Sequence, residues 1–263
     1  VYIMTRWGLP VSTSQAIVGT IIGWNVYSGS TTDLGTLTTI VSTWFFCPLL
    51  AGFLAAILLP IISWLLRKTK PHLLLLDQGT RWALLLAGAF GAYSLGANNI
   101  ANVMGVFVPA SPFGSVQLGP FLTLNSMQML FLLGGLAIAI GVFTYSRRVM
   151  MTVGNDLFQL SPVAAWVVVV SHSIVLFVFA STGLSSLLAG AGLPQIPLVP
   201  VSSSQAVVGA ILGIGLLKGG AGIRWPVLGG IGIGWVVTPV CAGLICLAIL
   251  FVLQNIFGQT VYQ

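Results

Sequence analysis

Long apolar stretches separated by short polar ones make up most of the chain. They cover residues 9–27, 35–66, 82–108, 122–145, 162–184, 200–217 and 226–253. About 20 helical residues cross the roughly 30 Å hydrocarbon core of a bilayer, and most of these stretches reach that length. The pattern therefore predicts an all-α polytopic membrane protein.

The stretch 35–66 is longer than one straight crossing requires. As an unbroken helix it would extend about 48 Å, at about 1.5 Å per residue. It contains Pro48 and Pro60, and prolines commonly kink helices. We expect either strong tilt or a break at a proline.

Two parts of the chain are copies of each other. Pro10-Val-Ser-Thr-Ser-Gln-Ala-Ile-Val-Gly19 matches Pro200-Val-Ser-Ser-Ser-Gln-Ala-Val-Val-Gly209, and Trp44 and Pro48 match Trp235 and Pro239 at nearly the same offset. A repeated offset over this length indicates two structural repeats.

The charges of equivalent loops predict how the repeats are oriented. The loop after the first copy, residues 28–34, has no Lys or Arg, whereas the loop after the second has Lys218 and Arg224. Basic loops stay in the cytoplasm, so equivalent loops lie on opposite sides of the membrane, as in inverted-topology repeats. We divide the chain into residues 1–70 (C-terminal part of repeat 1), 71–81 (cytoplasmic linker) and 82–263 (repeat 2), with broken or re-entrant helices meeting near the midplane and the C-terminus outside.

The composition supports lipid as the solvent and removes several function classes. Charged residues make up 5% of the chain and hydrophobic residues 57%, against about 25% charged in a typical soluble domain. The net charge of +6 sits at segment ends, which is expected of topology signals and not of nucleic-acid binding. With three Asp, no Glu, no metal-ligand spacing and no nucleophile or phosphate-loop motif, an enzyme is not expected.

Three polar clusters interrupt the apolar stretches and are the candidate site. They are Ser12, Thr13, Ser14 and Gln15; Asn98, Asn99 and Asn102; and Ser202, Ser203, Ser204 and Gln205. A proline before each serine cluster suits the first turn of a helix. Hydroxyls and free N–H groups at a helix start favour an anion, and two inverted copies can direct two such starts at one point.

The asparagines add a second kind of chemistry. Asn98 and Asn102 share a helix face; their amide oxygens suit Na⁺ and their N–H groups suit an oxyanion. Helix-packing polar contacts are the competing interpretation. His172 is a weaker candidate in the stretch 162–184.

These motifs resemble those of the inorganic phosphate transporter (PiT) family, which includes a sulfate permease branch. That family has two copies of Gly-Ala-Asn-Asp-x-Ala-Asn and two of Pro-Val-Ser-Thr-Thr-His. Gly96–Asn102 is similar to the first motif, Pro10–Gln15 and Pro200–Gln205 to the second, and Arg147–Gly154 to a further family segment. The other copy of the asparagine motif is expected upstream of Val1, so the chain is expected to lack the N-terminal part of repeat 1.

The resemblance implies a multi-pass cell-membrane symporter that moves phosphate with Na⁺ or H⁺ by alternating access. The resemblance implies no resident cofactor and no metal other than Na⁺ as the coupling ion. Its partners are the anion and membrane lipid, with a homodimer among the options. The implied substrate residues are Ser12, Thr13, Ser14, Asn98, Asn99, Ser202, Ser203 and Ser204, and the implied cation residues are Asn98, Asn102, Gln15 and Gln205.

At four positions the chain has a neutral residue where the family pattern has a titratable one. Asn99 and Met151 stand where acids are usual, and Gln15 and Gln205 stand where His is usual. Sulfate has no proton that would need an acid as acceptor, so a sulfate permease is an alternative. An anion channel or exchanger on the same scaffold, and a membrane enzyme or structural subunit, complete the alternatives.

Overall fold

The computed structural model describes residues 1–117 and 123–260, and about three quarters of them are helical. The helices are α1 (Tyr2–Arg6), α2 (Thr13–Ser28), α3 (Leu34–Thr69), α4 (Leu73–Met104), α5 (Ser126–Tyr145), α6 (Arg147–Met151), α7 (Pro162–Ala180), α8 (Thr182–Gly190), α9 (Ser203–Leu217) and α10 (Trp225–Asn255). A 3₁₀ turn covers Gly105–Phe107 and a π-helical turn Thr152–Asp156, while β1 (Val116–Gln117) pairs antiparallel with β2 (Thr123–Leu124). The all-α prediction is confirmed.

Four helices in the described part of the chain are long and apolar enough to cross a membrane: α3, α5, α7 and α10. Their surfaces suit lipid, because large apolar side chains such as Phe45, Leu49 and Phe53 on α3 are more than 60% exposed. A soluble monomer rarely exposes so large a patch. The helices α2 and α9, at 16 and 15 residues, are shorter than a crossing requires.

Helix α3 is continuous over 36 residues, with Pro48 and Pro60 inside it. Of the two expected alternatives, the break at a proline is wrong and strong tilt stays the prediction, because the helix is about 54 Å long. Its start is well capped, because the Asp33 carboxylate accepts from the Thr36 hydroxyl (2.6 Å) and from the N–H groups of Thr36 and Gly35. These bonds hold the pKa of the Asp33 carboxyl below its usual value.

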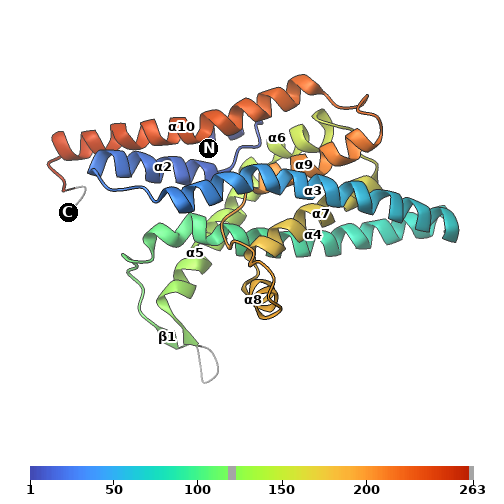
Figure 1. Cartoon of the computed structure of the whole chain (residues 1–263), viewed down its shortest axis with the longest axis horizontal. Coiled ribbons are helices and arrows are strands. Elements are labelled where there is room, and N and C mark those ends of the chain that lie inside the picture. Colours follow the sequence, from blue (N-terminus) through green and yellow to red (C-terminus); the bar gives the residue numbers. More distant parts are fainter. Residues whose placement is uncertain (118–122, 261–263) are drawn as a thin grey trace.

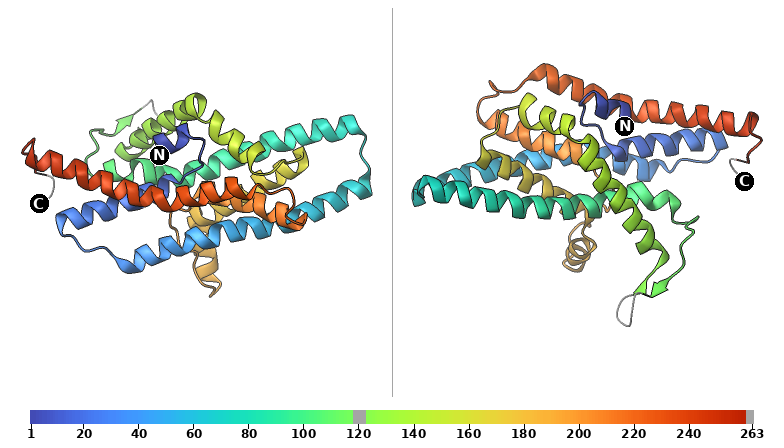
Figure 2. Two further views of the ribbon diagram at one scale, coloured as in Figure 1. Left: turned by 90° about the horizontal axis from the view of Figure 1, so that it is seen from above. Right: turned by 180° about the vertical axis from the view of Figure 1, so that it is seen from behind.

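The two sequence copies exchange partners in the fold. The first helix of one copy, α2, packs along α10, and the first helix of the other, α9, packs along α3 (Figure 1; Figure 2). Helix α7 contacts α3, α4 and α9 and completes the core. Two repeats related by a twofold axis require this reciprocal packing; the inverted topology itself stays a prediction.

Glycines make both crossings possible. A side chain at Gly19 would overlap the backbone of Pro239, and one at Gly209 would overlap the backbone of Pro48. The same correspondence relates Gly23 and Gly243 to Gly213 and Gly52, where the helix backbones again meet directly. Matching glycines and prolines from the repeats therefore set the closest approach of each helix pair.

Several segment boundaries differ from the sequence-based expectations. Helix α4 begins at Leu73, before the predicted apolar stretch 82–108; the cytoplasmic location of residues 71–81 stays a prediction. The stretch 162–184 is two helices, because the chain turns at the extended residue Ser181 and α8 then projects away from the bundle (Figure 1). Helix α5 follows the hairpin of β1 and β2 and leads back toward the bundle (Figure 2). Leu122, the first residue of the predicted stretch 122–145, lies outside the described residues.

Candidate substrate-binding site

Both copies of the serine motif form the same capped helix start. The Ser12 hydroxyl oxygen accepts from the backbone N–H of Gln15, and that of Ser202 accepts from the N–H of Gln205, each at 3.3 Å. Each serine is therefore the N-cap, and Pro10 and Pro200 lie outside the helices. The prediction of a proline in the first turn is wrong, because each helix begins after a serine that accepts from one N–H of the first turn.

The two helix starts meet inside the protein, although 190 residues separate them. The Ser14 hydroxyl donates to the backbone carbonyl of Val201 (3.5 Å), and the Cys47 thiol donates to that of Ser202 (3.7 Å). Ser12, Ser14, Val201 and Ser202 are at most 3% exposed. Two short helices thus begin in the interior, as the prediction of broken or re-entrant helices requires.

The asparagine cluster on α4 joins this junction. The Asn102 amide donates to the Ser14 hydroxyl (2.9 Å) and to the Asn99 amide oxygen (3.5 Å). Asn99 in turn donates to the carbonyl of Leu95 (3.1 Å). Ser14 therefore links three elements that the sequence analysis singled out separately.

Three buried amide oxygens at these motifs have no hydrogen-bond partner within the described chain. They are Oε1 of Gln15, Oε1 of Gln205 and Oδ1 of Asn98, on side chains 2%, 5% and 5% exposed. An unpaired buried acceptor costs about 1–3 kcal/mol. Three of the four residues predicted to bind a cation thus carry an oxygen that a ligand would stabilise.

A cavity of about 170 Å³ opens beside the asparagines. Asn98 and Asn102 line it from α4, Thr182 from α8, and Val199 and Pro200 from the segment before α9. A water molecule takes up about 30 Å³ of liquid, so the cavity accommodates a small tetrahedral oxyanion.

Three further members of the predicted set are less enclosed. Thr13 is exposed and Ser203 is half-buried, while the Ser204 hydroxyl pairs with that of Ser202 at 3.1 Å. His172 lies on α7 between buried Ser171 and Ser173, apart from the hydrogen bonds of the junction.

The junction contains no carboxylate. Asp77 pairs with Arg81 (2.9 Å), Asp156 pairs with Arg224 (3.7 Å), and Asp33 caps α3. The chain has no other acidic residue. The candidate site is therefore built from neutral groups.

Trp235 contacts the first serine motif, a role that the sequence did not indicate. The Trp235 indole N–H donates to the carbonyl of Pro10 (2.9 Å), whereas the indole N–H of its counterpart Trp44 is buried without a partner in the part of the chain described. The matched offset of the two tryptophans was the available signal.

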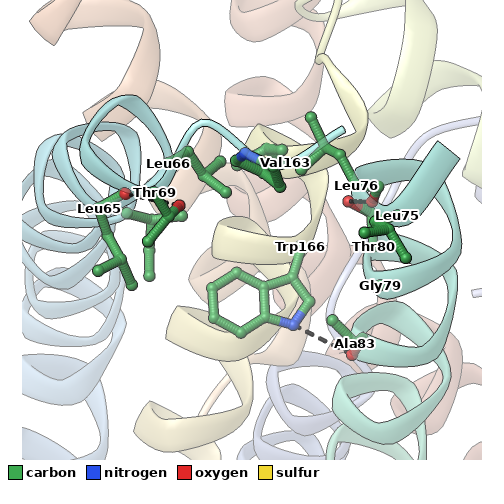
Figure 3. Close-up of a pocket in the computed structure, with 12 residues that line it drawn as sticks. Leu65, Leu66, Thr69, Leu75, Leu76, Gly79, Thr80, Ala83, Val163 and Trp166 are labelled. Carbon is green, nitrogen blue, oxygen red and sulfur yellow. Dashed lines mark hydrogen bonds between the residues drawn. The ribbon is translucent and has the colours of Figure 1, made fainter. Parts of the chain in front are cut away.

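The large apolar pocket between the ends of α3, α4 and α7 is a different kind of cavity (Figure 3). Its volume is about 370 Å³, and its polar groups are already used. The Trp166 indole donates to Ala83, and the Thr69 and Thr80 hydroxyls donate to their own helices. With no free donor, it cannot replace the hydration shell of an anion.

A sequence model of the phosphate transporter family matches residues 1–246 and 196–262. The chain belongs to this family. Transporters, and not enzymes, make up the family, which confirms both the predicted resemblance and the non-enzymatic function.

Individual relatives agree. The chain is 28% identical over 237 residues to the "Putative phosphate permease" of Methanocaldococcus jannaschii, covering 90% of this chain and 66% of that protein. It is 26% identical over 188 residues to sodium-dependent phosphate transporter 1 of Xenopus tropicalis, covering 71% of this chain and 24% of that protein. The chain therefore spans about two thirds or less of the length of these relatives.

A solved structure titled "The sodium-dependent phosphate transporter" has a similar fold. The TM-score is 0.70 at 23% sequence identity, over 97% of this chain and 76% of that one. At this identity the likeness establishes the fold.

Proposed function

We propose that the protein is a symporter that carries inorganic phosphate with Na⁺ by alternating access. The observation that carries the proposal is the junction where two capped helix starts meet the asparagine face of α4. Hydrogen-bond donors for an anion and unpaired oxygens for a cation lie there on the same three helices, α2, α4 and α9.

The anion half of the site uses helix starts and hydroxyls. The first N–H groups of a helix and its positive dipole end favour an oxyanion, and α2 and α9 both begin in the junction. We assign the substrate to Ser12, Thr13, Ser14, Asn98, Asn99, Ser202, Ser203 and Ser204.

The cation half uses the amide oxygens. Gln15, Gln205 and Asn98 each present a buried, unpaired oxygen, and Asn102 completes the set. A hard cation such as Na⁺ takes oxygen ligands, and transporters commonly bind it where helices are interrupted. A proton would instead need a titratable acceptor, and the three aspartates lie elsewhere.

The neutral composition of the junction supplies the physical basis for coupling. A phosphate dianion moved from water into a site without protein cations loses hydration energy that neutral dipoles replace only in part. A bound Na⁺ compensates part of that charge, and the anion does the same for the Na⁺. Each ion therefore stabilises the other, which is what a symporter requires.

Alternating access is supported by unequal bonding of matching residues. Trp235 is bonded to Pro10, whereas Trp44 is unpaired although its equivalent acceptor would be the carbonyl of Pro200. Likewise Cys47 donates to Ser202, whereas its counterpart Thr238 donates within its own helix to Gly234. We infer that the repeats exchange these two arrangements during transport.

The test is uptake of labelled phosphate by the full-length protein in proteoliposomes. We expect saturable uptake driven by an inward Na⁺ gradient and little response to a proton gradient. Absence of saturable uptake of phosphate and of sulfate would overturn the proposal, and conductance independent of any cation gradient would indicate a channel.

Sulfate is the second candidate substrate, because the junction has no carboxylate to accept the proton of hydrogen phosphate. Competition between labelled phosphate and unlabelled sulfate separates the two. If sulfate displaces phosphate at lower concentration than phosphate itself, the protein is a sulfate permease on this scaffold.

A further inference from the structure

A basic pocket lies at the end of α5, away from the junction. Thr5 and Arg6 line it from α1, Thr144 and Tyr145 from α5, and Arg147 and Arg148 from α6, around a volume of about 350 Å³. We propose that this pocket binds the phosphate group of an anionic phospholipid headgroup. The same chemistry could hold free phosphate, and the experiment below distinguishes the two sources.

The pocket is assembled from distant parts of the chain. The Arg148 guanidinium donates to the backbone carbonyl of Arg6 at 2.7 Å. The Tyr2 and Tyr145 rings meet edge to face, with centroids 5.7 Å apart. A hydrogen bond and an aromatic contact thus hold α1 against the end of α5.

The positive charge of the pocket is not balanced within the described chain. The two ion pairs found there join Arg81 to Asp77 and Arg224 to Asp156. The third acid, Asp33, is bonded to Thr36 at the start of α3. Three guanidinium groups around one cavity repel each other, so an anion between them is stabilising.

The donors available to a ligand match a phosphate group. The Thr5 and Thr144 hydroxyls already donate to backbone carbonyls, at 3.2 and 2.7 Å. The guanidinium groups remain, and their planar forks bind phosphate oxygens in pairs. Tyr145 also lines the cavity.

The location favours a lipid over a dissolved ion. The pocket follows directly on α5, which is a candidate span, and Phe143 and Tyr145 there are 90% and 52% exposed. Tyrosines are enriched at headgroup depth, and basic residues beside a span attract anionic lipids. Since the junction is built on α2, α4 and α9, the inference does not depend on the proposed transport function.

Native mass spectrometry of the full-length protein tests the proposal. Delipidated protein is incubated with phosphatidylglycerol or phosphatidylcholine, and retained lipid is counted for the wild type, R147Q/R148Q and the charge-matched control R67Q/K68Q. We expect retention of phosphatidylglycerol over phosphatidylcholine, reduced about fivefold for each arginine removed, as about 1 kcal/mol per basic residue implies. The control removes the same charge at the end of α3 but no residue that lines the pocket, so it should retain more lipid than R147Q/R148Q.

A second arm separates the lipid from free phosphate. Calorimetric titration of lipid-free protein with inorganic phosphate is compared between the wild type and R147Q, which leaves the bond from Arg148 to Arg6 in place. Loss of a phosphate site with lipid retention unchanged would assign the phosphate group to solution. Equal lipid retention and equal phosphate binding in the wild type and both arginine variants, with unchanged thermal unfolding, would overturn the proposal.

Discussion

Asn98 and Asn102 lie one turn apart on α4, yet their amides are used differently. Asn102 donates to Ser14 and Asn99 and so holds the junction together, whereas the oxygen of Asn98 is buried without a partner. Removing a bonded group leaves its partner unsatisfied, while removing an unpaired oxygen does not. Changing Asn98 therefore tests ligand binding alone, whereas changing Asn102 also affects stability.

We predict that Asn98→Ala raises the Na⁺ concentration for half-maximal phosphate uptake about tenfold, because one ligand of about 1.4 kcal/mol is lost. Its thermal unfolding temperature should stay at the wild-type value. Asn102→Ala should lower that temperature, and Asn155→Ala, at an exposed position, should change neither quantity. Unchanged Na⁺ dependence in Asn98→Ala would remove Asn98 from the cation site.

The helix crossings of α2 with α10 and of α3 with α9 depend on glycine. At these positions one backbone lies directly on another, so even a methyl group has no space. Not every helical glycine has this role, because Gly88 on α4 faces open space.

We predict that Gly209→Ala destabilises the protein by about 1–3 kcal/mol, because the added methyl overlaps the carbonyl of Pro48 and forces α9 away from α3. Thermal unfolding in detergent measures the change. Gly88→Ala serves as the control and should leave stability unchanged or slightly raised. Equal behaviour of the two variants would show that the crossing tolerates a wider separation.

The paired tryptophans allow a test of exchange between the repeats. Trp235→Phe removes a formed hydrogen bond and should lower the unfolding temperature of the described state, by about 1 kcal/mol in free energy. Trp44→Phe removes an unpaired N–H and should not lower it. Both variants should slow transport if the bonds alternate, so a transport defect in Trp235→Phe alone would contradict the exchange.

At the scale of the whole molecule, a site built from neutral groups binds phosphate and Na⁺ well only when each ion stabilises the other. We predict that saturating Na⁺ tightens phosphate binding at least tenfold, and that phosphate tightens Na⁺ binding by the same factor, as linkage demands. Calorimetric titrations of each ion with and without the other measure both factors. Independent binding of the two ions would contradict the coupling proposed here.

The orientation of the chain also remains a prediction at this scale. In a variant without Cys47, Cys241 and Cys246, a cysteine introduced at Gln259 should react with an impermeant reagent from outside intact cells. One at the exposed Ala221, between basic Lys218 and Arg224, should react only after permeabilisation. The opposite pattern would reverse the topology; the residues after 260 lie outside the described structure.

The sequence by itself determined membrane residence, the two repeats and the three polar clusters. Each is a property of the order of residues along the chain: apolar length, a repeated offset, and hydroxyl or amide side chains in an apolar stretch. No contact had to be known to find them, and Ser14, Asn102 and Ser202 were identified in this way.

The tertiary structure decided how those groups are used. Helix α3 continues through Pro48, because the effect of a proline on a helix depends on what surrounds it. Here Gly209 lets α9 lie directly against the turn of α3 that contains Pro48. The Ser14 hydroxyl became a donor to the carbonyl of Val201, 187 residues away, and the amide of Gln15 was left with an unpaired oxygen. Such partners are settled between segments far apart in the chain. The same holds for the arginines around the basic pocket, since Arg6 and Arg148 become neighbours only when the chain is folded.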